Sequence, residues 1–188
     1  MRRGNLFVVS GPSGAGKGTL VARLLHEVPD AWVSVSATTR APREGEIDGV
    51  HYYFKTRDEF DELVAADGLL EWATYAGNSY GTPRAAVEAK MAEGKQVILE
   101  IDVQGAFQIK DKIPQAHLVF IEPPSLEVLE NRLRGRHTET EDVIASRMKA
   151  AQVELSRKME YDVRVINDDL DEATRELVAY INEQAEQQ

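Results

Sequence analysis

Short apolar runs and amphipathic segments alternate along most of the chain. The apolar runs, rich in β-branched or aromatic residues, predict buried strands over residues 6–9, 32–35, 97–101, 117–121 and 163–166. Between them, apolar residues recur at every third or fourth position, as in the segment from Leu20 to Val28, which predicts amphipathic helices. This alternation favours an α/β fold, in which a parallel β-sheet is flanked by helices and ligands bind at the carboxyl ends of the strands.

Several helix ends carry their own signals. The first helix should end near Pro29, because proline cannot continue a helix. Thr56 and Glu59 have the spacing of a capping box, and Thr82 before Pro83 predicts an N-cap with proline in the first helical turn. Two more helices are expected around residues 126–133 and 144–155, the second with Thr138 and Glu141 as a capping pair.

Two segments interrupt this rhythm. Residues 42–49 are polar and rich in turn formers, and residues 51–54 are aromatic, so we expect an inserted flap of short mixed or antiparallel strands. Residues 135–140 join two helices with little apolar anchoring and could close over a nucleotide as a lid. We therefore expect one domain, with a core over residues 1–36 and 83–188, an insertion over 37–82 and a lid over 134–142.

Composition limits the class of protein. With 188 residues, of which 43% are hydrophobic, the chain can build one sizeable core but not two ordinary domains. The absence of cysteine excludes disulfides and a cysteine nucleophile, and the chain has no long apolar run or signal-peptide pattern. A formal net charge of −10 disfavours nucleic-acid binding. We expect a cytoplasmic protein that binds neither membranes nor nucleic acid.

A glycine-rich loop follows the first predicted strand and precedes the first predicted helix. It comprises Gly11, Pro12, Ser13, Gly14, Ala15, Gly16, Lys17, Gly18 and Thr19. Glycines let backbone N–H groups converge on an anion, the helix adds the positive end of its dipole, and the lysine adds a point charge. The context predicts a nucleoside triphosphate site, with a glycine turn that binds no ligand as the alternative. Gly18 stands where a hydroxyl usually contacts Mg²⁺, and Thr19 follows it.

The predicted insertion carries residues suited to a second phosphate. Arg40 and Arg43 offer two guanidinium forks, and Tyr52 and Tyr80 offer neutral donors. The alternative is a solvated basic turn beside ordinary sheet tyrosines. A second group of arginines, near the predicted lid, contains Arg132, Arg134, Arg136 and Arg147.

Two carboxylates suit the recognition of a guanine base. Guanine presents N1–H and a 2-amino group, both donors, which Glu71 and Asp102 could accept. Adenine presents a bare N1 acceptor there, so a buried Glu71 would reject it. Glu71 could instead be a surface acid on an edge strand, and Glu100 and Asp102 could instead hold Mg²⁺ through water.

Taken together, these segments resemble the guanylate kinase family. The matching segments are Ser34 to Arg43, Asp102 to Gly105, Arg132 to Arg136, Thr138 to Thr140 and Asn167 to Leu170, in the family's order, and the resemblance extends from about Leu6 to Ile181. It implies a P-loop NTPase type of core with a mixed α+β GMP-binding flap and a short lid. It implies that guanine is held by Ser36, Glu71, Thr82 and Asp102, and the GMP phosphate by Arg40, Arg43, Tyr52 and Tyr80.

The resemblance also implies an activity. The γ-phosphoryl group of ATP would pass to GMP, with Mg²⁺ as cofactor and without a general base, since the attacking phosphate oxygen is already ionised. ATP would bind at Gly11 to Thr19, with Arg136 and Asn167 near the adenine, and the catalytic charges would come from Lys17, Arg40, Arg43, Arg132, Arg136 and Arg147. A water-mediated metal contact falls to Thr19, Glu100 or Asp102. The alternatives are a kinase for another nucleoside monophosphate and a noncatalytic guanylate-kinase-like module that binds protein partners.

Overall fold

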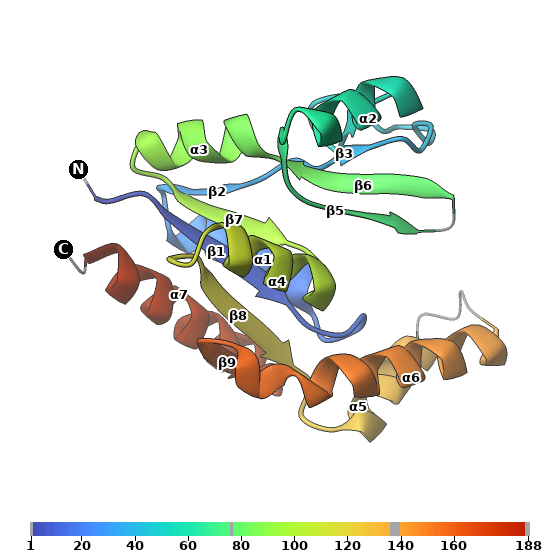
Figure 1. Cartoon of the computed structure of the whole chain (residues 1–188). Helices are drawn as coiled ribbons and strands as arrows, with labels where there is room; N and C mark the ends of the chain where they lie inside the picture. Colours follow the sequence, from blue (N-terminus) through green and yellow to red (C-terminus); the bar gives the residue numbers. More distant parts are fainter. Residues whose placement is uncertain (1, 76, 136–139, 187–188) are drawn as a thin grey trace.

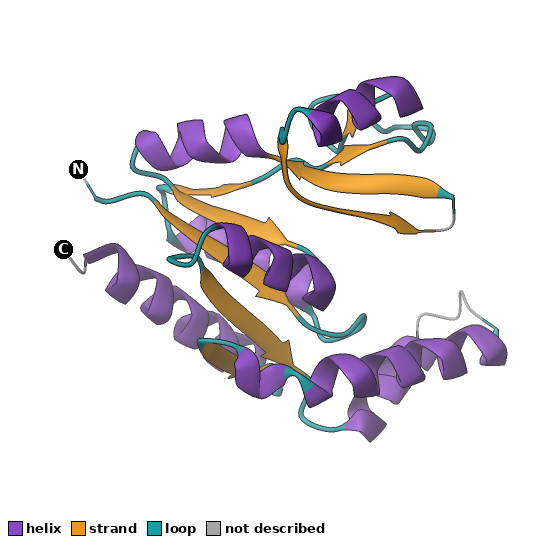
Figure 2. Cartoon of the chain, viewed as in Figure 1, coloured by secondary structure: helices purple, strands orange, loops and turns teal. Residues whose placement is uncertain are grey.

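Two β-sheets and seven α-helices make up the part of the chain that the structure, a computed structural model, describes: residues 2–75, 77–135 and 140–186. The larger sheet has the order β2-β7-β1-β8-β9, and all its strand pairs are parallel. Its strands are β1 (Asn5–Ser10), β2 (Ala31–Val33), β7 (Gln96–Glu100), β8 (His117–Glu122) and β9 (Val163–Ile166). The expected parallel α/β core is confirmed (Figures 1 and 2).

The central strand shows why helices cover both faces of this sheet. Successive side chains of a strand point to opposite faces. Leu6 and Val8 of β1 accordingly pack in one apolar cluster and Phe7 and Val9 in another. The first cluster includes residues of α3 (Arg84–Ala92) and α4 (Val103–Lys112), and the second includes residues of α1 (Lys17–Glu27) and α7 (Leu170–Glu186). Because β1 is buried on both faces, its central residues, Leu6 to Val9, are all apolar, as the sequence pattern indicated.

A second, smaller unit is inserted between β2 and β7. Its sheet has the order β4-β3-β6-β5, with β3 parallel to β4 and antiparallel to β6, and β5 antiparallel to β6. The elements are β3 (Ala37–Thr38), β4 (Tyr53–Phe54), α2 (Arg57–Ala65), β5 (Leu69–Tyr75) and β6 (Asn78–Pro83). They pack on a core of their own around Ala37, Phe60 and Leu69. The expectation of short mixed strands is confirmed, and so is the capping box at Thr56.

Helix α4 joins the two units. It packs along β5, the edge strand of the smaller sheet. The side-chain amide of Gln108 accepts a hydrogen bond from the backbone N–H of Trp72 and donates one to its carbonyl, both at 3.3 Å. The ammonium group of Lys112 donates to the carbonyl of Leu69 at 3.0 Å. The insertion is thus fixed to the core along one helix.

The remaining helices lie beyond β8. Helix α5 (Leu126–Arg134) and helix α6 (Glu141–Ser156) pack on each other, and a short 3₁₀ helix, η1 (Lys158–Glu160), leads into β9. In Figure 1 the blue loop after β1 lies between the insertion, at the top, and α5 and α6, at the lower right. Among the described residues, none of the helices has the length and apolar content needed to cross a membrane.

Three expectations about local structure need correction or fall outside the description. Strand β2 ends at Val33 and not at residue 35, because the chain then leaves β7 to enter the insertion. The N-cap of α3 is Pro83, and Thr82 stays in β6, where its hydroxyl bonds a buried carboxylate instead of the helix end. Thr138 lies outside the described residues, and Thr140, the N-cap of α6, makes no capping bond with its side chain.

Candidate functional site

The glycine-rich loop connects the end of β1 to the start of α1 by a path that needs glycine. Gly11, Gly14 and Gly16 have φ angles of 141°, 91° and 93°. A Cβ atom on Gly11 would lie 2.2 Å from the carbonyl oxygen of Ile121. Alternation of left- and right-handed residues turns successive N–H groups toward one side, which makes a concave anion site. Lys17 follows directly, and its ammonium group donates to the carbonyl groups of Gly11 and, at 3.1 Å, Pro12.

Neighbouring elements hold the crest of this loop from outside. Leu129 and Leu133 of α5 approach Gly14, since a Cβ atom on that glycine would lie 3.1 Å from each of their side chains. Arg147 of α6 donates a hydrogen bond to the hydroxyl of Ser13 at 2.7 Å. Asn167, which follows β9, donates from its side-chain amide to the carbonyl of Ala15 at 2.8 Å. The loop therefore has a defined shape before any ligand binds.

Oxygen donors stand where α1 begins. Gly18 and Thr19 are exposed, and a Cβ atom on Gly18 would lie 3.7 Å from a carboxylate oxygen of Glu100, at the end of β7. The described residues contain no cluster of three or more side chains able to hold a metal ion. Mg²⁺ prefers oxygen ligands, and in a phosphoryl-transfer site it keeps most of them from water and phosphate.

A cavity of about 230 Å³ separates the insertion from the carboxyl end of β7. Its lining includes Ser36, Tyr52, Glu71, Tyr80, Glu100 and Asp102. Five of these are residues that the sequence assigned to GMP, and they come from five separate segments of the chain. Thr82 is buried directly behind the cavity. The structure thus brings together the predicted base-binding residues.

Glu71 is the unusual group of this cavity. Its side chain is buried, with only 7% of the residue exposed. Burial and the nearby charge of Asp102 raise its pKa to about 7, against the opposing hydrogen bond from Thr82, whose hydroxyl donates to Glu71 Oε1 at 2.7 Å. A carboxylate in this position is costly to ionise without further donors. The site therefore favours a ligand that supplies N–H groups.

Two neighbours of Glu71 are set by the start of α4. The carboxylate of Asp102 accepts a hydrogen bond from the N–H of Gly105 at 2.7 Å and caps the helix. A Cβ atom on Gly105 would lie 3.0 Å from Glu71 Oε2. Glycine at this position therefore leaves the room that the Glu71 carboxylate occupies. Sequence reasoning did not select Gly105, although it stands in a segment that resembles the guanylate kinases.

The arginines of the insertion flank the cavity. Arg40 donates to Glu46 Oε1 at 2.8 Å, and its guanidinium lies 5.3 Å from the centre of the Tyr52 ring. The bond from Arg40 is the main reason that the pKa of Glu46 falls to about 2. Arg43 is exposed, and its backbone N–H donates to the other carboxylate oxygen of Glu46 at 2.7 Å. Sequence reasoning assigned Glu46 no role in the site, although its position three residues after Arg43 could have indicated a partner for an arginine.

Two arginines of the group near the predicted lid lie beside the phosphate loop, on the side of α5 and α6. Arg147 reaches Ser13, as described above, and Arg132 donates to the backbone carbonyl of Asn167 at 2.8 Å. Arg134 instead pairs with Glu130 at 2.7 Å on the surface of α5. Arg136 lies outside the described residues, as do residues 137–139 of the predicted lid. Two arginines predicted near the transferred group are therefore found beside the loop.

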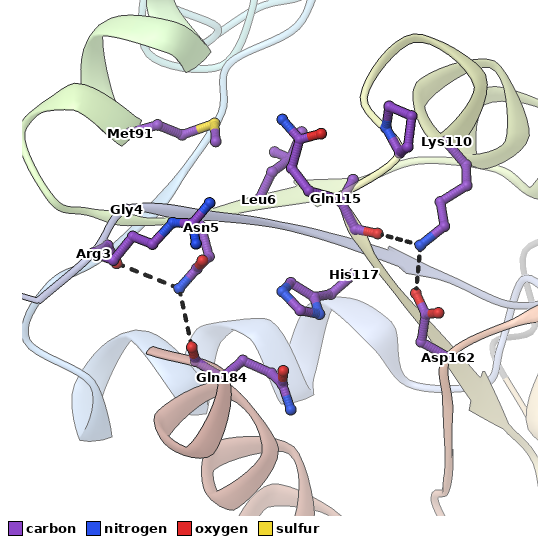
Figure 3. Close-up of a pocket in the computed structure, with 12 residues that line it drawn as sticks. Arg3, Gly4, Asn5, Leu6, Met91, Lys110, Gln115, His117, Asp162 and Gln184 are labelled. Atoms are coloured by element: carbon purple, nitrogen blue, oxygen red, sulfur yellow. Dashed lines mark hydrogen bonds and ion pairs between the residues drawn. The ribbon is translucent and has the colours of Figure 1, made fainter. Parts of the chain in front are cut away.

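A larger cavity, of about 430 Å³, opens at the opposite edge of the main sheet (Figure 3). It surrounds the amino ends of β1 and β8, with His117 in its centre and Lys110 bonded to Asp162 at 3.0 Å. None of the residues predicted for nucleotide binding lines it. The predicted residues gather at the carboxyl ends of the strands, where ligands of α/β sheets bind.

Comparison with known proteins agrees with this geometry. A family model described as guanylate kinase matches residues 3–184. A guanylate kinase of Synechocystis sp. is 55% identical over 97% of this chain and 95% of its own length, and one of Synechococcus sp. is 54% identical over 93% and 92%. The crystal structure of guanylate kinase from Anaplasma phagocytophilum, 32% identical, aligns with a TM-score of 0.78 over 100% of this chain and 89% of that one.

Proposed function

Because this chain belongs to the guanylate kinase family, we propose that it transfers the γ-phosphoryl group of ATP to GMP and yields ADP and GDP. The observation that carries the proposal is the buried carboxylate of Glu71 beside Asp102, in a cavity whose lining includes Glu100, the neighbour of Gly18 in the phosphate loop. One carboxylate pair would select the base of the acceptor, and the loop would hold the donor. The two ligands would then face each other across the carboxyl end of the main sheet.

The guanine base would be recognised by hydrogen-bond acceptors of the protein. Its N1–H and 2-amino groups would donate to Glu71 and Asp102, and the hydroxyl groups of Ser36 and Thr82 would complete the base site. Adenine would place the lone pair of N1 against Glu71, so a buried acceptor would lose its donor. The hydrogen bond from Thr82 to Glu71 supports this reading, because it fixes one carboxylate oxygen and leaves the other for the ligand.

The GMP phosphate would be held by the residues that flank the cavity. Arg40 and Arg43 would bind its oxygens through their guanidinium groups, and Tyr52 and Tyr80 would donate from their phenols. The edge-to-face contact of the two tyrosine rings, with centres 6.2 Å apart, supports a shared role. Glu46 would keep Arg40 extended over Tyr52 until the phosphate arrives.

The ATP phosphates would lie in the concave loop from Gly11 to Thr19. Backbone N–H groups would neutralise the β- and γ-phosphates, and Lys17 would exchange its present carbonyl partners for phosphate oxygens. Arg132, Arg136 and Arg147 would neutralise charge on the transferring group. Mg²⁺, when bound, would screen the phosphate oxygens, and the residues placed to reach its water ligands are Thr19, Glu100 and Asp102.

The chemical step needs positioning more than proton transfer. A phosphate oxygen of GMP, already ionised, would attack the γ-phosphorus as the bond from that phosphorus to the departing ADP oxygen breaks. Lys17 and the arginines would stabilise the charge that spreads over the three equatorial oxygens. Exclusion of water by the insertion and the lid would keep the phosphoryl group from hydrolysis.

The test is ADP release from Mg-ATP with GMP, dGMP, AMP, UMP or no acceptor. We expect turnover with GMP and background rates with AMP and UMP. Glu71→Gln should lower kcat/KM for GMP by on the order of 100-fold, because the amide has one acceptor oxygen in place of two and turns an NH₂ donor toward the base. Thr74→Val, at an exposed position of the same strand, is the matched control. Turnover with AMP equal to that with GMP would contradict the base assignment.

A further inference from the structure

Asn167 occupies a place that base recognition does not explain. It follows β9 directly, and its backbone N–H extends the strand ladder by donating to the carbonyl of Glu122 at 2.8 Å. Only 6% of the residue is exposed. Its side-chain amide donates to the carbonyl of Ala15 at 2.8 Å in a buried bond. The resemblance to guanylate kinases implied a contact with adenine, but this amide is directed at the loop that faces the phosphates.

The bond acts on the orientation of one peptide group. In a planar trans peptide, the C=O of Ala15 and the N–H of Gly16 point in opposite directions. With the carbonyl of Ala15 held by Asn167, the N–H of Gly16 is turned away from Asn167, toward the opposite side of the loop. An anion site built from backbone donors depends on such orientations.

The fit between Asn167 and Gly16 is tight. A Cβ atom on Gly16 would lie 2.2 Å from the Asn167 amide nitrogen, and the φ angle of Gly16 is 93°. Glycine at this position thus serves two needs, the left-handed backbone and the close approach of the amide. The pair forms a matched contact between the loop and the end of β9.

Asn167 also touches the arginine group. Its backbone carbonyl accepts the hydrogen bond from Arg132 of α5 at 2.8 Å. One residue therefore links the guanidinium of Arg132 to the crest of the phosphate loop. Any shift of the strand end at Asn167 would move both the loop carbonyl and this guanidinium.

We infer that Asn167 is a positioning residue that fixes the phosphate loop and Arg132 relative to each other, so that it sets the affinity for the triphosphate part of the nucleotide and not for its base. The inference rests on the proposed function, since it assumes that the loop binds phosphates. It adds Asn167 to the residues of the proposed phosphate site, as one that acts indirectly, through Ala15 and Arg132. It predicts that base-free polyphosphate depends on Asn167 as strongly as ATP does.

The test measures binding of Mg-ATP and of Mg-tripolyphosphate, which has no base, by titration calorimetry. Asn167→Ala leaves the buried carbonyl of Ala15 without its donor, and we expect roughly tenfold weaker binding of both ligands, with the affinity for GMP unchanged. Asn167→Asp, which keeps the size and sets an acceptor against the Ala15 carbonyl, should weaken both at least as much. The second variant keeps the test informative if the first is unstable.

Asn5→Ala is the matched control. Asn5 is a buried asparagine at the amino end of β1, and its amide donates to Gln96 at 3.0 Å, far from the loop. This variant should lower the melting temperature without changing the affinity for tripolyphosphate. Weaker ATP binding with unchanged tripolyphosphate binding in the Asn167 variants would overturn the inference in favour of adenine recognition, and unchanged binding of both would overturn it outright. If the unmodified protein bound neither ligand, the proposed function itself would fail.

Discussion

The phosphate loop and the insertion offer two different ways of holding a phosphate. The loop is one continuous segment whose donors are backbone N–H groups, and it is already shaped by bonds from Arg147 and Asn167. The insertion offers side chains from distant segments, and its Arg40 is paired with Glu46. A site built from backbone N–H groups needs a fixed path of the chain. A site built from side chains needs those side chains to leave their present partners, as Arg40 would leave Glu46. We infer that the phosphate loop has its binding shape before the ligand arrives and that the site on the insertion is completed by its ligand.

The largest effect should come from the loop. Lys17→Met removes the point charge nearest the transferred group, and we expect kcat to fall by on the order of 100-fold or more. A coupled assay of ADP release measures it. Lys95→Met, at the opposite edge of the main sheet, is the matched control and should leave kcat unchanged. Near-normal turnover of the Lys17 variant would mean that the preformed loop supplies the charge without its lysine.

A smaller effect should come from the base site and depend on pH. The guanine donors need an ionised Glu71, whose pKa is raised to about 7. Below that pH a proton must leave before GMP binds, so the affinity should fall toward tenfold per pH unit, as titration between pH 5.5 and 8 would show. In Glu71→Gln the affinity for GMP should lose the pH dependence caused by the Glu71 carboxyl and keep only the part caused by titration of the GMP phosphate. Identical pH profiles of the two proteins would contradict the assignment.

The same carboxyl should affect stability in the opposite sense. Between its ordinary pKa near 4.5 and the folded value of about 7, the folded protein keeps a proton that the unfolded chain has lost. The stabilisation is complete below the lower value and disappears as the pH rises through the higher one, a change of about 3 kcal/mol. Urea unfolding of the protein and of Glu71→Gln across this range would measure the difference.

The smallest effect should come from the partner of Arg40. Glu46→Gln removes the charge that holds the guanidinium over Tyr52, and we expect KM for GMP to rise by up to roughly fivefold, with KM for ATP unchanged. Steady-state kinetics with each substrate varied would measure it. Glu44→Gln makes the same charge change at an exposed neighbour. An equal effect in both variants would assign the change to net charge and not to the pairing.

The sequence predicted most where structure depends on neighbouring residues. The apolar runs of β1, β7, β8 and β9 and the capping box at Thr56 are read from short windows, and the structure has them. The phosphate loop is equally local, since glycines at fixed offsets before Lys17 determine its path. The clustering of Ser36, Tyr52, Glu71 and Asp102 could be proposed from the resemblance.

Contacts between distant segments could not be read in this way. Thr82 has the sequence pattern of an N-cap, but its hydroxyl donates a hydrogen bond to the carboxylate of Glu71, eleven residues earlier, and not to the helix end. Asn167 reaches Ala15 across 152 residues, and only the order of the strands brings them together. Helix α4 was not predicted from the sequence, and its place is set by packing against β5 and the main sheet. Such features follow from tertiary structure and leave no periodic signal.

The packing of α4 on β5 has a consequence for how copies of this protein behave when crowded. An edge strand offers free N–H and C=O groups to any other chain, which is a common route to aggregation. Here Gln108 occupies both backbone groups of Trp72, and Lys112 occupies the carbonyl of Leu69 and adds a charge. The helix thus stands where a further strand would pair, and it protects the edge of the smaller sheet from intermolecular β-pairing.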